Sequence, residues 1–358
     1  MYHPTSSFAR LSVIVCSVAI VCGGITLPAP PAVAAPWAGR IDTTDMAAVR
    51  DAYLHVYLPA IKVGNGWTGD GASCNAGRAS AAAREAAITV INYYRALDGL
   101  APVSENAAAT RTAQQTALMM FVNNTLSHNP STTWTCYSDA GGTAAGESNL
   151  ALGYATAGQS IDGYMDDGGP MPQEVGHRSW ILYPPQSQVG VGIAGNGAGS
   201  GYAIQLWGQD GMQNNSRPAS GTPWPAPGYF PFQNLPSQYW SYAEPGRDFG
   251  SARVAVTKNG KPLATSGVTQ TTGFGDPKAF WTMPKLTRPA RGTSDKYIVT
   301  LSGVRGGHAA TVTYAVQVFN AAEALPAGMT PSCHGCFGDD CRQAAVCQRH
   351  AGHWWWWP

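Results

Sequence analysis

The chain has 358 residues, 44% of them hydrophobic, so it can bury a sizeable core and is long for a single domain. Only 12% of the residues are charged, and 22 basic against 21 acidic side chains give a net charge of +1. This balance provides no basic field for phosphate groups, so we expect no nucleic acid partner. The 42 glycines and 26 prolines are interleaved with aromatic and β-branched residues, which predicts a folded, loop-rich protein.

Residues 1–34 have the pattern of an export signal. No charged side chain lies between Leu11 and Gly39, and the apolar run that begins at Leu11 is followed by small residues that supply a cleavage site before Ala35. The alternative is an uncleaved membrane anchor, for which the apolar run is short. We therefore expect a secreted mature chain without a stable membrane anchor after signal cleavage.

Six of the eight cysteines follow the export signal, two in the body of the chain and four near its end. An even number of exported cysteines predicts disulfides, and Cys74 with Cys136 is the only pair that the body can make. A lone buried thiol at each position is the alternative. For residues 326–358, rich in cysteine and tryptophan, we expect a disordered tail. The alternatives are two disulfides or a zinc ligand set drawn from Cys333, Cys336, Cys341, Cys347, His350 and His353.

Helical periodicity dominates the first half of the mature chain. Within a loosely structured lead-in, residues 35–74, a helix from Met46 to Leu58 is predicted to end at Pro59. Apolar spacing predicts further helices over 80–97, over 105–123 with Ser104 as N-cap, and over 156–167. Short apolar runs at 180–183, 189–194 and 202–207 predict strands. Helices followed by an antiparallel sheet indicate an α+β domain over about 75–210.

The remainder of the chain reads as a linker and an all-β domain. Residues 211–228 have the glycine, asparagine and proline content of a linker. Alternating apolar residues over 254–256, 297–301 and 312–318, with a hairpin turn at Asn259-Gly260, predict a small β-sandwich of the immunoglobulin-like kind over 229–325.

Two histidines are the candidate functional residues. His128 follows the second long helix and His177 precedes the first expected strand, so both lie where binding residues are common. Glu147, the acidic pair at 166–167 and Glu174 lie between them in the sequence. Two imidazoles and two carboxylates that folding brings together can coordinate a divalent cation such as zinc or orient a water molecule. The alternative is that each histidine only satisfies loop backbone.

Four motifs in order resemble the CAP superfamily, also called SCP-like, which groups cysteine-rich secretory proteins, antigen 5 and plant pathogenesis-related proteins. The resemblance covers about residues 75–210 and implies an α-β-α sandwich. The motifs are Ile91-Asn92-Tyr93-Tyr94-Arg95, Leu126-Ser127-His128, Gly146-Glu147-Ser148-Asn149 and Gly176-His177-Arg178-Ser179-Trp180.

In that family two histidines and two acidic residues line a cleft, and in several members they bind a divalent metal, most often zinc. The resemblance assigns these roles to His128, Glu147 and His177. For the second acidic residue it offers Asp167, at the place of the glutamate in the family's W-x-x-E pattern, with Glu174 as competitor. Arg178 stands where many members have tyrosine.

The resemblance implies a secreted, non-enzymatic protein that binds a small apolar molecule, a peptide or another protein at this cleft, since members are reported to bind sterols and other lipids. The alternative is a metal-dependent extracellular peptidase or esterase with Glu147 as general base. Against it, the chain lacks an H-E-x-x-H helix. A serine triad using Ser127 or Ser148 is a further alternative, without the expected strand-to-helix elbow.

Overall fold

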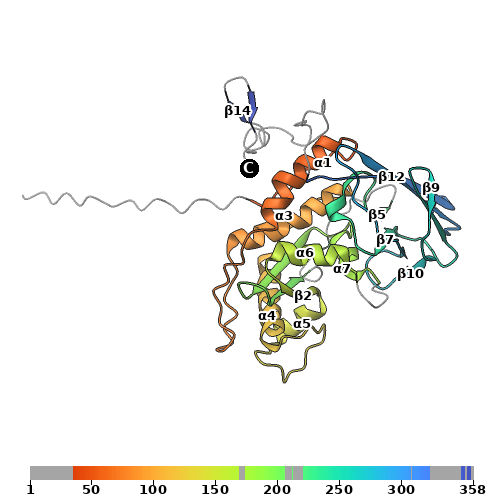
Figure 1. Ribbon diagram of the computed structural model, residues 1–358. Helices are drawn as coiled ribbons and strands as arrows, with labels where there is room; N and C mark the ends of the chain where they lie inside the picture. The colour runs from red at the N-terminus through yellow and green to blue at the C-terminus, as the bar shows by residue number, and fades with distance from the viewer. Residues whose placement is uncertain are drawn as a thin grey trace, which may run out of the picture. The chain divides into compact units, whose positions relative to one another are not determined.

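The computed structural model describes residues 35–168, 174–205, 212, 221–307, 309–322, 348–350 and 353–355 (Figure 1). The predicted export signal, part of the expected linker and the tail's four cysteines lie outside these residues. In the tail, β14 (Gln348–His350) pairs antiparallel with β15 (His353–Trp355). The predictions about disulfides, zinc or disorder in the tail therefore stay predictions.

The lead-in carries a helical segment made of α1 (Met46–Ala52), a π-helix η1 (Tyr53–Tyr57) and α2 (Leu58–Ala60). The predicted stop at Pro59 is wrong, because Pro59 lies in the first turn of α2, where a missing N–H costs little. The lead-in is also less loose than expected. Val49, Tyr53 and Tyr57 are buried in the main hydrophobic core.

The two long helices follow the predicted pattern, with one changed cap. Helix α3 (Ala81–Leu97) is capped by Ser80, whose side chain accepts from the N–H of Ala83. After the end of the helix, Gly99 has φ +67°. Helix α4 (Ala107–Asn123) is capped by the side chain of Asn106, not by Ser104. Ser104 cannot serve as cap because Ser104–Glu105 forms strand β1, which pairs with β3 (Gln188–Ala194).

Three shorter helices complete this part of the chain: α5 (Asp139–Gly146), α6 (Ala157–Asp166) and α7 (Gly176–Ile181). Helix α6 agrees with the prediction and is capped by Thr156. Helix α5 lies in a segment for which no helix was predicted. The strand expected at 180–183 is wrong, because Trp180 and Ile181 belong to α7. A short apolar run does not by itself distinguish a strand from a buried helical turn.

The part of the chain that resembles the CAP superfamily, about residues 75–210, contains a sheet of four strands in the order β1-β3-β4-β2. Strand β4 (Ser200–Gln205) pairs antiparallel with β3 and with β2 (Ser148–Tyr154), whereas β1 runs parallel to β3. Strands β3 and β4 occupy the predicted segments. Strand β2 was not predicted, and it begins one residue after Glu147.

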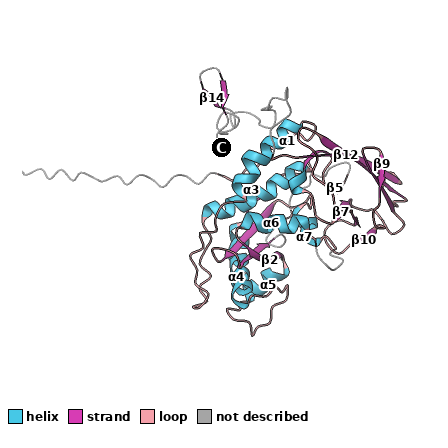
Figure 2. Ribbon diagram, in the orientation of Figure 1, coloured by secondary structure: helices cyan, strands magenta, loops and turns pink. Residues whose placement is uncertain are grey.

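Helices cover both faces of this sheet (Figure 2). Val191 and Ile193 pack into the core that contains α3 and α6. The alternate residues Gly190 and Gly192 face α4, so closely that a Cβ on Gly192 would lie 2.0 Å from the carbonyl oxygen of Ala113. The backbone of α4 therefore rests directly on glycines of β3, which explains why small residues alternate with large ones there.

We expect Gly192→Ala to lower the free energy of unfolding by about 2 to 3 kcal/mol, because the added methyl group must push α4 away from the sheet. Urea unfolding followed by fluorescence measures the change. Gly64→Ala is the matched control, since its added Cβ meets nothing within 4 Å. Equal unfolding midpoints for the two variants would show that the α4–β3 contact is looser than the structure indicates.

Residues 221–322, named here the β region, form two further sheets. One has the order β10-β11-β7-β5 and the other β6-β13-β12-β8-β9. The predicted hairpin at Asn259-Gly260 is confirmed, with φ values of 50° and 79° between β8 and β9. The strands are β5 (Thr222–Trp224), β6 (Gly228–Pro231), β7 (Tyr239–Ala243), β8 (Arg253–Lys258), β9 (Lys261–Leu263), β10 (Thr269–Thr271), β11 (Lys278–Thr282), β12 (Ser294–Ser302) and β13 (Thr311–Phe319), with a 3-10 turn η2 (Phe232–Asn234) after β6.

The α+β class is confirmed, while the immunoglobulin-like arrangement of the β region stays a prediction. Part of the expected linker is wrong, since residues 222–224 form a strand and Trp224 is fully buried. The ring of Trp224 packs edge-on to Tyr94 of α3, with centroids 5.7 Å apart. Proline and glycine content suggested a linker there, but the large aromatic side chain places the segment in the core.

A buried hydrogen-bond network joins three helices at Asp162 of α6. The hydroxyls of Tyr57 and Tyr94 each donate to its carboxylate at 2.7 Å. Burial raises the pKa of Asp162 to about 6, although the two hydrogen bonds lower it. Because the pKa of Asp162 is higher in the folded than in the unfolded state, the protonated carboxyl stabilises the fold fully below about pH 4. This contribution to the free energy of unfolding is lost as the pH rises through about 6.

We therefore compare the free energies of unfolding of the wild type and of Asp162→Asn. Between pH 4 and pH 7 we expect the wild type to lose about 2 kcal/mol relative to the variant, because only the wild type carries the titrating carboxyl. Urea unfolding at a series of pH values measures it. A difference that is independent of pH would contradict the raised pKa.

Candidate functional site

His177 lies in the first turn of α7 and is oriented by Asp167. Its Nδ1 is 2.9 Å from Oδ1 of Asp167, and its ring stacks on Tyr164 with centroids 5.3 Å apart. The other oxygen of Asp167 accepts the backbone N–H of Arg178 at 3.2 Å. The Asp167 side chain is 1% exposed and that of His177 33% exposed. Asp167 thus orients the ring, and Nε2 is the nitrogen left for a ligand.

His128 is held in a similar way from the exposed loop after α4. Its Nδ1 lies 2.9 Å from the carbonyl oxygen of Ala145 in the last turn of α5. A carbonyl oxygen can only accept, so Nδ1 carries the proton and Nε2 is again the nitrogen that can meet a ligand. Both histidines are therefore fixed through the same ring atom.

In the sequence, Glu147 lies between Ala145, which contacts the His128 ring, and Asn149, which contacts the backbone of His177. It follows α5 as the C-cap residue, and its Oε2 accepts from Nε2 of Gln205 at 2.8 Å. Two residues later, Nδ2 of Asn149 donates to the backbone oxygen of His177 at 2.9 Å. Ala145 and Asn149 are four residues apart, which spans at most about 14 Å. One short segment thus contacts His128 at one end and His177 at the other.

The two residues offered for the second acidic position have different surroundings. Asp167 contacts His177, as described above. Glu174 is exposed, and its Oε2 accepts the hydroxyl of Thr271 in β10 at 2.9 Å, which directs it toward the β region. The structure therefore brings Asp167 to His177 and ties Glu174 to β10.

The donor chemistry fits a divalent cation such as zinc. A ligating histidine commonly donates its second ring nitrogen to a carboxylate or a carbonyl, as both histidines do here, and Glu147 would supply an oxygen. Among the described residues, however, no three His, Cys, Asp or Glu side chains are grouped closely enough to hold a metal. The zinc site stays a proposal.

The hydroxyls of both candidate serines are hydrogen-bonded to backbone groups. The hydroxyl of Ser148 is buried and donates to the carbonyl oxygen of Ala144 at 2.7 Å. The hydroxyl of Ser127 accepts the backbone N–H of Asn129. These contacts give no support to the serine triad that the sequence left open.

Sequence reasoning missed two amides that support the site. Asn149 and Gln205 are 2% and 3% exposed on neighbouring strands β2 and β4. Gln205 holds Glu147 while its own Oε1 accepts from Thr112 of α4 at 2.6 Å. For Asn149 the available signal was its position in the Gly-Glu-Ser-Asn motif. A polar amide next to a candidate site residue needs hydrogen-bond partners once it is buried in a strand.

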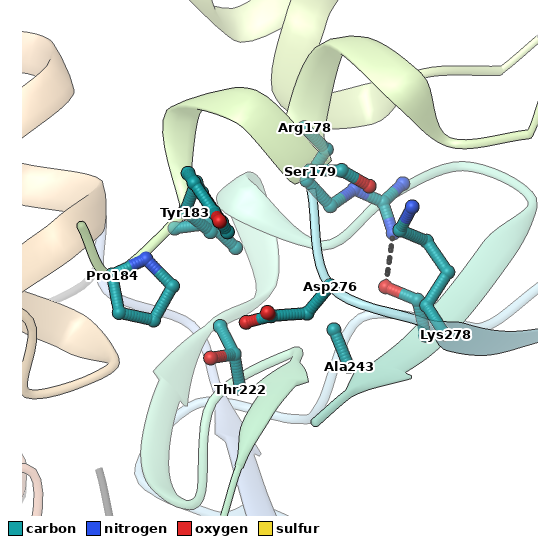
Figure 3. A pocket seen from close by; sticks show the side chains of 10 residues that line it. Arg178, Ser179, Tyr183, Pro184, Thr222, Ala243, Asp276 and Lys278 are labelled. Carbon is teal, nitrogen blue, oxygen red and sulfur yellow. Dashed lines mark hydrogen bonds between the residues drawn. The ribbon is translucent and has the colours of Figure 1, made fainter. Parts of the chain in front are cut away.

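A cavity of ≈ 20 Å³ lies near α7, where the helix meets β5, β7 and β11 (Figure 3). Arg178 approaches it from α7 and Lys278 from β11. Burial lowers the pKa of Lys278 to about 8, against the opposing effect of nearby carboxylates such as Glu174 and Asp276. The volume suits one water molecule or so, not an organic ligand.

The family model described as the cysteine-rich secretory protein family, CAP, matches residues 88–209. The match confirms the predicted resemblance over these residues. No curated protein matches the chain. Among the described residues, no helix has both the length and the apolar content needed to span a membrane.

Proposed function

We propose that this chain is an exported CAP-domain protein that binds an extracellular ligand at the face formed by His128, Glu147 and His177, named here the histidine face. The observation that carries the proposal is the common restraint on the two imidazoles. Each is held at Nδ1, by Ala145 or by Asp167, so that Nε2 is presented in a defined orientation. Orienting a ring in advance reduces the entropy lost when a ligand binds.

Two exposed apolar residues support a ligand with an apolar portion, Leu126 close to His128 in the sequence and Phe274 next to the residue before His177. Leu126 and Phe274 are the large hydrophobic side chains exposed among the described residues, at 44% and 36%. Leu126 precedes His128 by two residues. Phe274 lies against Gly176, the residue before His177, where an added Cβ would be 3.2 Å from its ring. The ligand class that fits is a small amphipathic molecule with one polar end.

A divalent cation such as zinc would need His128, Glu147 and His177 to lie closer together than they do in the structure. Once bound, it would polarise an oxygen of the ligand. Without it, the two Nε2 atoms can hydrogen-bond the polar end of the ligand directly. Burial of Leu126 and Phe274 would supply the apolar part of the binding energy in either case.

A dansylated C11 fatty acid is a suitable probe, because its fluorescence rises when its aromatic group leaves water. We expect saturable binding to the wild type, and an affinity at least about tenfold weaker for Leu126→Ser with Phe274→Ser. His128→Gln with His177→Gln should also weaken it. His55→Gln is the matched control, since His55 lies on η1 and pairs with Asp51 of α1, in the helical segment that precedes α3.

Equal affinities in all four proteins, or no saturable binding, would contradict the proposal. Metal analysis of the same purified proteins tests the zinc component separately. Equal zinc content in the wild type and in the double histidine variant would exclude the metal and leave ligand binding to be judged by the probe.

A further inference from the structure

The segment that carries His177 has a strained backbone that packing against the β region holds in place. Val175, two residues before His177, has φ +45° and is fully buried. Positive φ is a rare backbone state for a β-branched residue and persists only where the surroundings enforce it. Val175 forms a separate hydrophobic cluster with Tyr239 of β7 and Phe280 of β11. The β region thus supplies the packing that holds this backbone in place.

Arg178, directly after His177, bridges the CAP domain and the β region. In the CAP domain its guanidinium donates to the carbonyl oxygens of Met165 at 2.8 Å and Asp166 at 2.7 Å. In β7 it donates to the carbonyl oxygen of Tyr239 at 2.9 Å and to the hydroxyl of Ser241 at 3.2 Å, a contact drawn in Figure 3. Its backbone N–H donates to Asp167, the residue that orients His177.

The loop that joins β10 and β11 holds the same segment from another side. Thr271 donates to Glu174 at 2.9 Å, and the ring of Phe274 covers Gly176. The loop is itself anchored by Lys278, whose amine donates to the carbonyl oxygen of Phe274. Thr271 and Phe274 thus add two contacts from the β region to those at Val175 and Arg178.

Residues 174, 175, 176 and 178 therefore contact the β region, while His177 between them turns to Asp167. We propose that the β region acts as a positioning element for His177, with Arg178 and Phe274 as the positioning residues. The proposal rests on the proposed function only in treating the histidine face as the binding site. The planar fork of donors of an arginine suits this position, because it reaches backbone oxygens of α6 and of β7 at the same time.

The test is the tautomer of His177, read from the ring-nitrogen signals of the full chain labelled with ¹⁵N-histidine, at pH 8 without added metal or ligand. His177→Gln assigns the signals. In the wild type we expect widely separated signals, as for a ring protonated at Nδ1. In Arg178→Lys and in Phe274→Ala the separation should shrink, because the ring no longer keeps one orientation toward Asp167, while the His128 signals stay unchanged.

Phe274 is partly exposed, so Phe274→Ala decides the matter even if Arg178→Lys does not fold. Lys258→Ala is the matched control, since Lys258 pairs with Asp295 elsewhere in the β region. Unchanged His177 signals in a folded Phe274→Ala variant, or equal shifts in the control, would overturn the proposal. Because the measurement uses no ligand, its outcome is independent of whether the probe or zinc binds.

Discussion

Replacing Arg95 with methionine is expected to lower the free energy of unfolding by about 4 kcal/mol. Arg95 is fully buried on α3, and its guanidinium donates to four backbone oxygens that lie within 2.7 to 3.1 Å. Methionine keeps most of the apolar stem but leaves those carbonyls without their donor. The acceptors are Ala101, Ile181, Tyr183 and Gln186.

The neighbouring carboxyl adds to this cost. Burial raises the pKa of Asp98 well above its usual value, and the Arg95 charge opposes that shift. Without Arg95, the cost of ionising Asp98 increases. Three of the four acceptors lie in or after α7, so Arg95 also links α3 to the end of the helix that carries His177.

Urea unfolding of Arg95→Met against the wild type measures the loss. Arg84→Met is the control, because Arg84 forms a partly exposed ion pair with Glu105 at 2.8 Å, and such pairs contribute less than about 1 kcal/mol. A loss as small as that of the control would mean that the four carbonyls find other partners.

Local signals predicted much of the helical part of the fold. Helices form over the predicted segments 80–97 and 156–167, and their first residues, Ser80 and Thr156, cap them by chemistry that acts within one turn. The alternation in β12 and β13 is similarly local, because one face of each strand is buried. These features need no knowledge of the rest of the chain.

The wrong predictions are those in which distant parts of the chain decide. Ser104 is a suitable cap in isolation, but its backbone pairs with β3. Trp224 lies among prolines and glycines, yet it packs on Tyr94 more than a hundred residues away. Helix α5 contains Gly141 and Gly142, which disfavour helix but leave room for neighbouring side chains. Periodicity does not detect such contacts.

The candidate site follows the same division. The motifs identified His128, Glu147 and His177 as residue types, because side chains of this kind at loop ends indicate binding. They did not indicate which nitrogen of each ring is held, or that Gln205 holds Glu147, since these contacts join separate elements. The role of the β region around α7 was equally outside the reach of the sequence pattern.

Removing the disulfide is expected to lower the free energy of unfolding by about 4 kcal/mol. The predicted bridge between Cys74 and Cys136 is confirmed, and it closes a loop with a sequence separation of 62 residues. A crosslink of this span restricts the unfolded chain by roughly that amount in the chain-entropy model. Replacing both cysteines by serine in one variant avoids leaving a single reactive thiol.

The bridge also bears on the histidine face, because His128 lies in the loop between α4 and α5 that Cys136 ties to the segment before α3. The free energy of unfolding of Cys74→Ser with Cys136→Ser should therefore be lower than that of the wild type. The ¹⁵N signals of His128 should change. Those of His177 should stay as in the wild type, because Asp167 and Arg178 hold that segment independently of the bridge. Unfolding is measured in urea with and without a reductant. Reductant should destabilise the wild type more than the variant, and an equal effect on both would place the stabilisation in other cysteines.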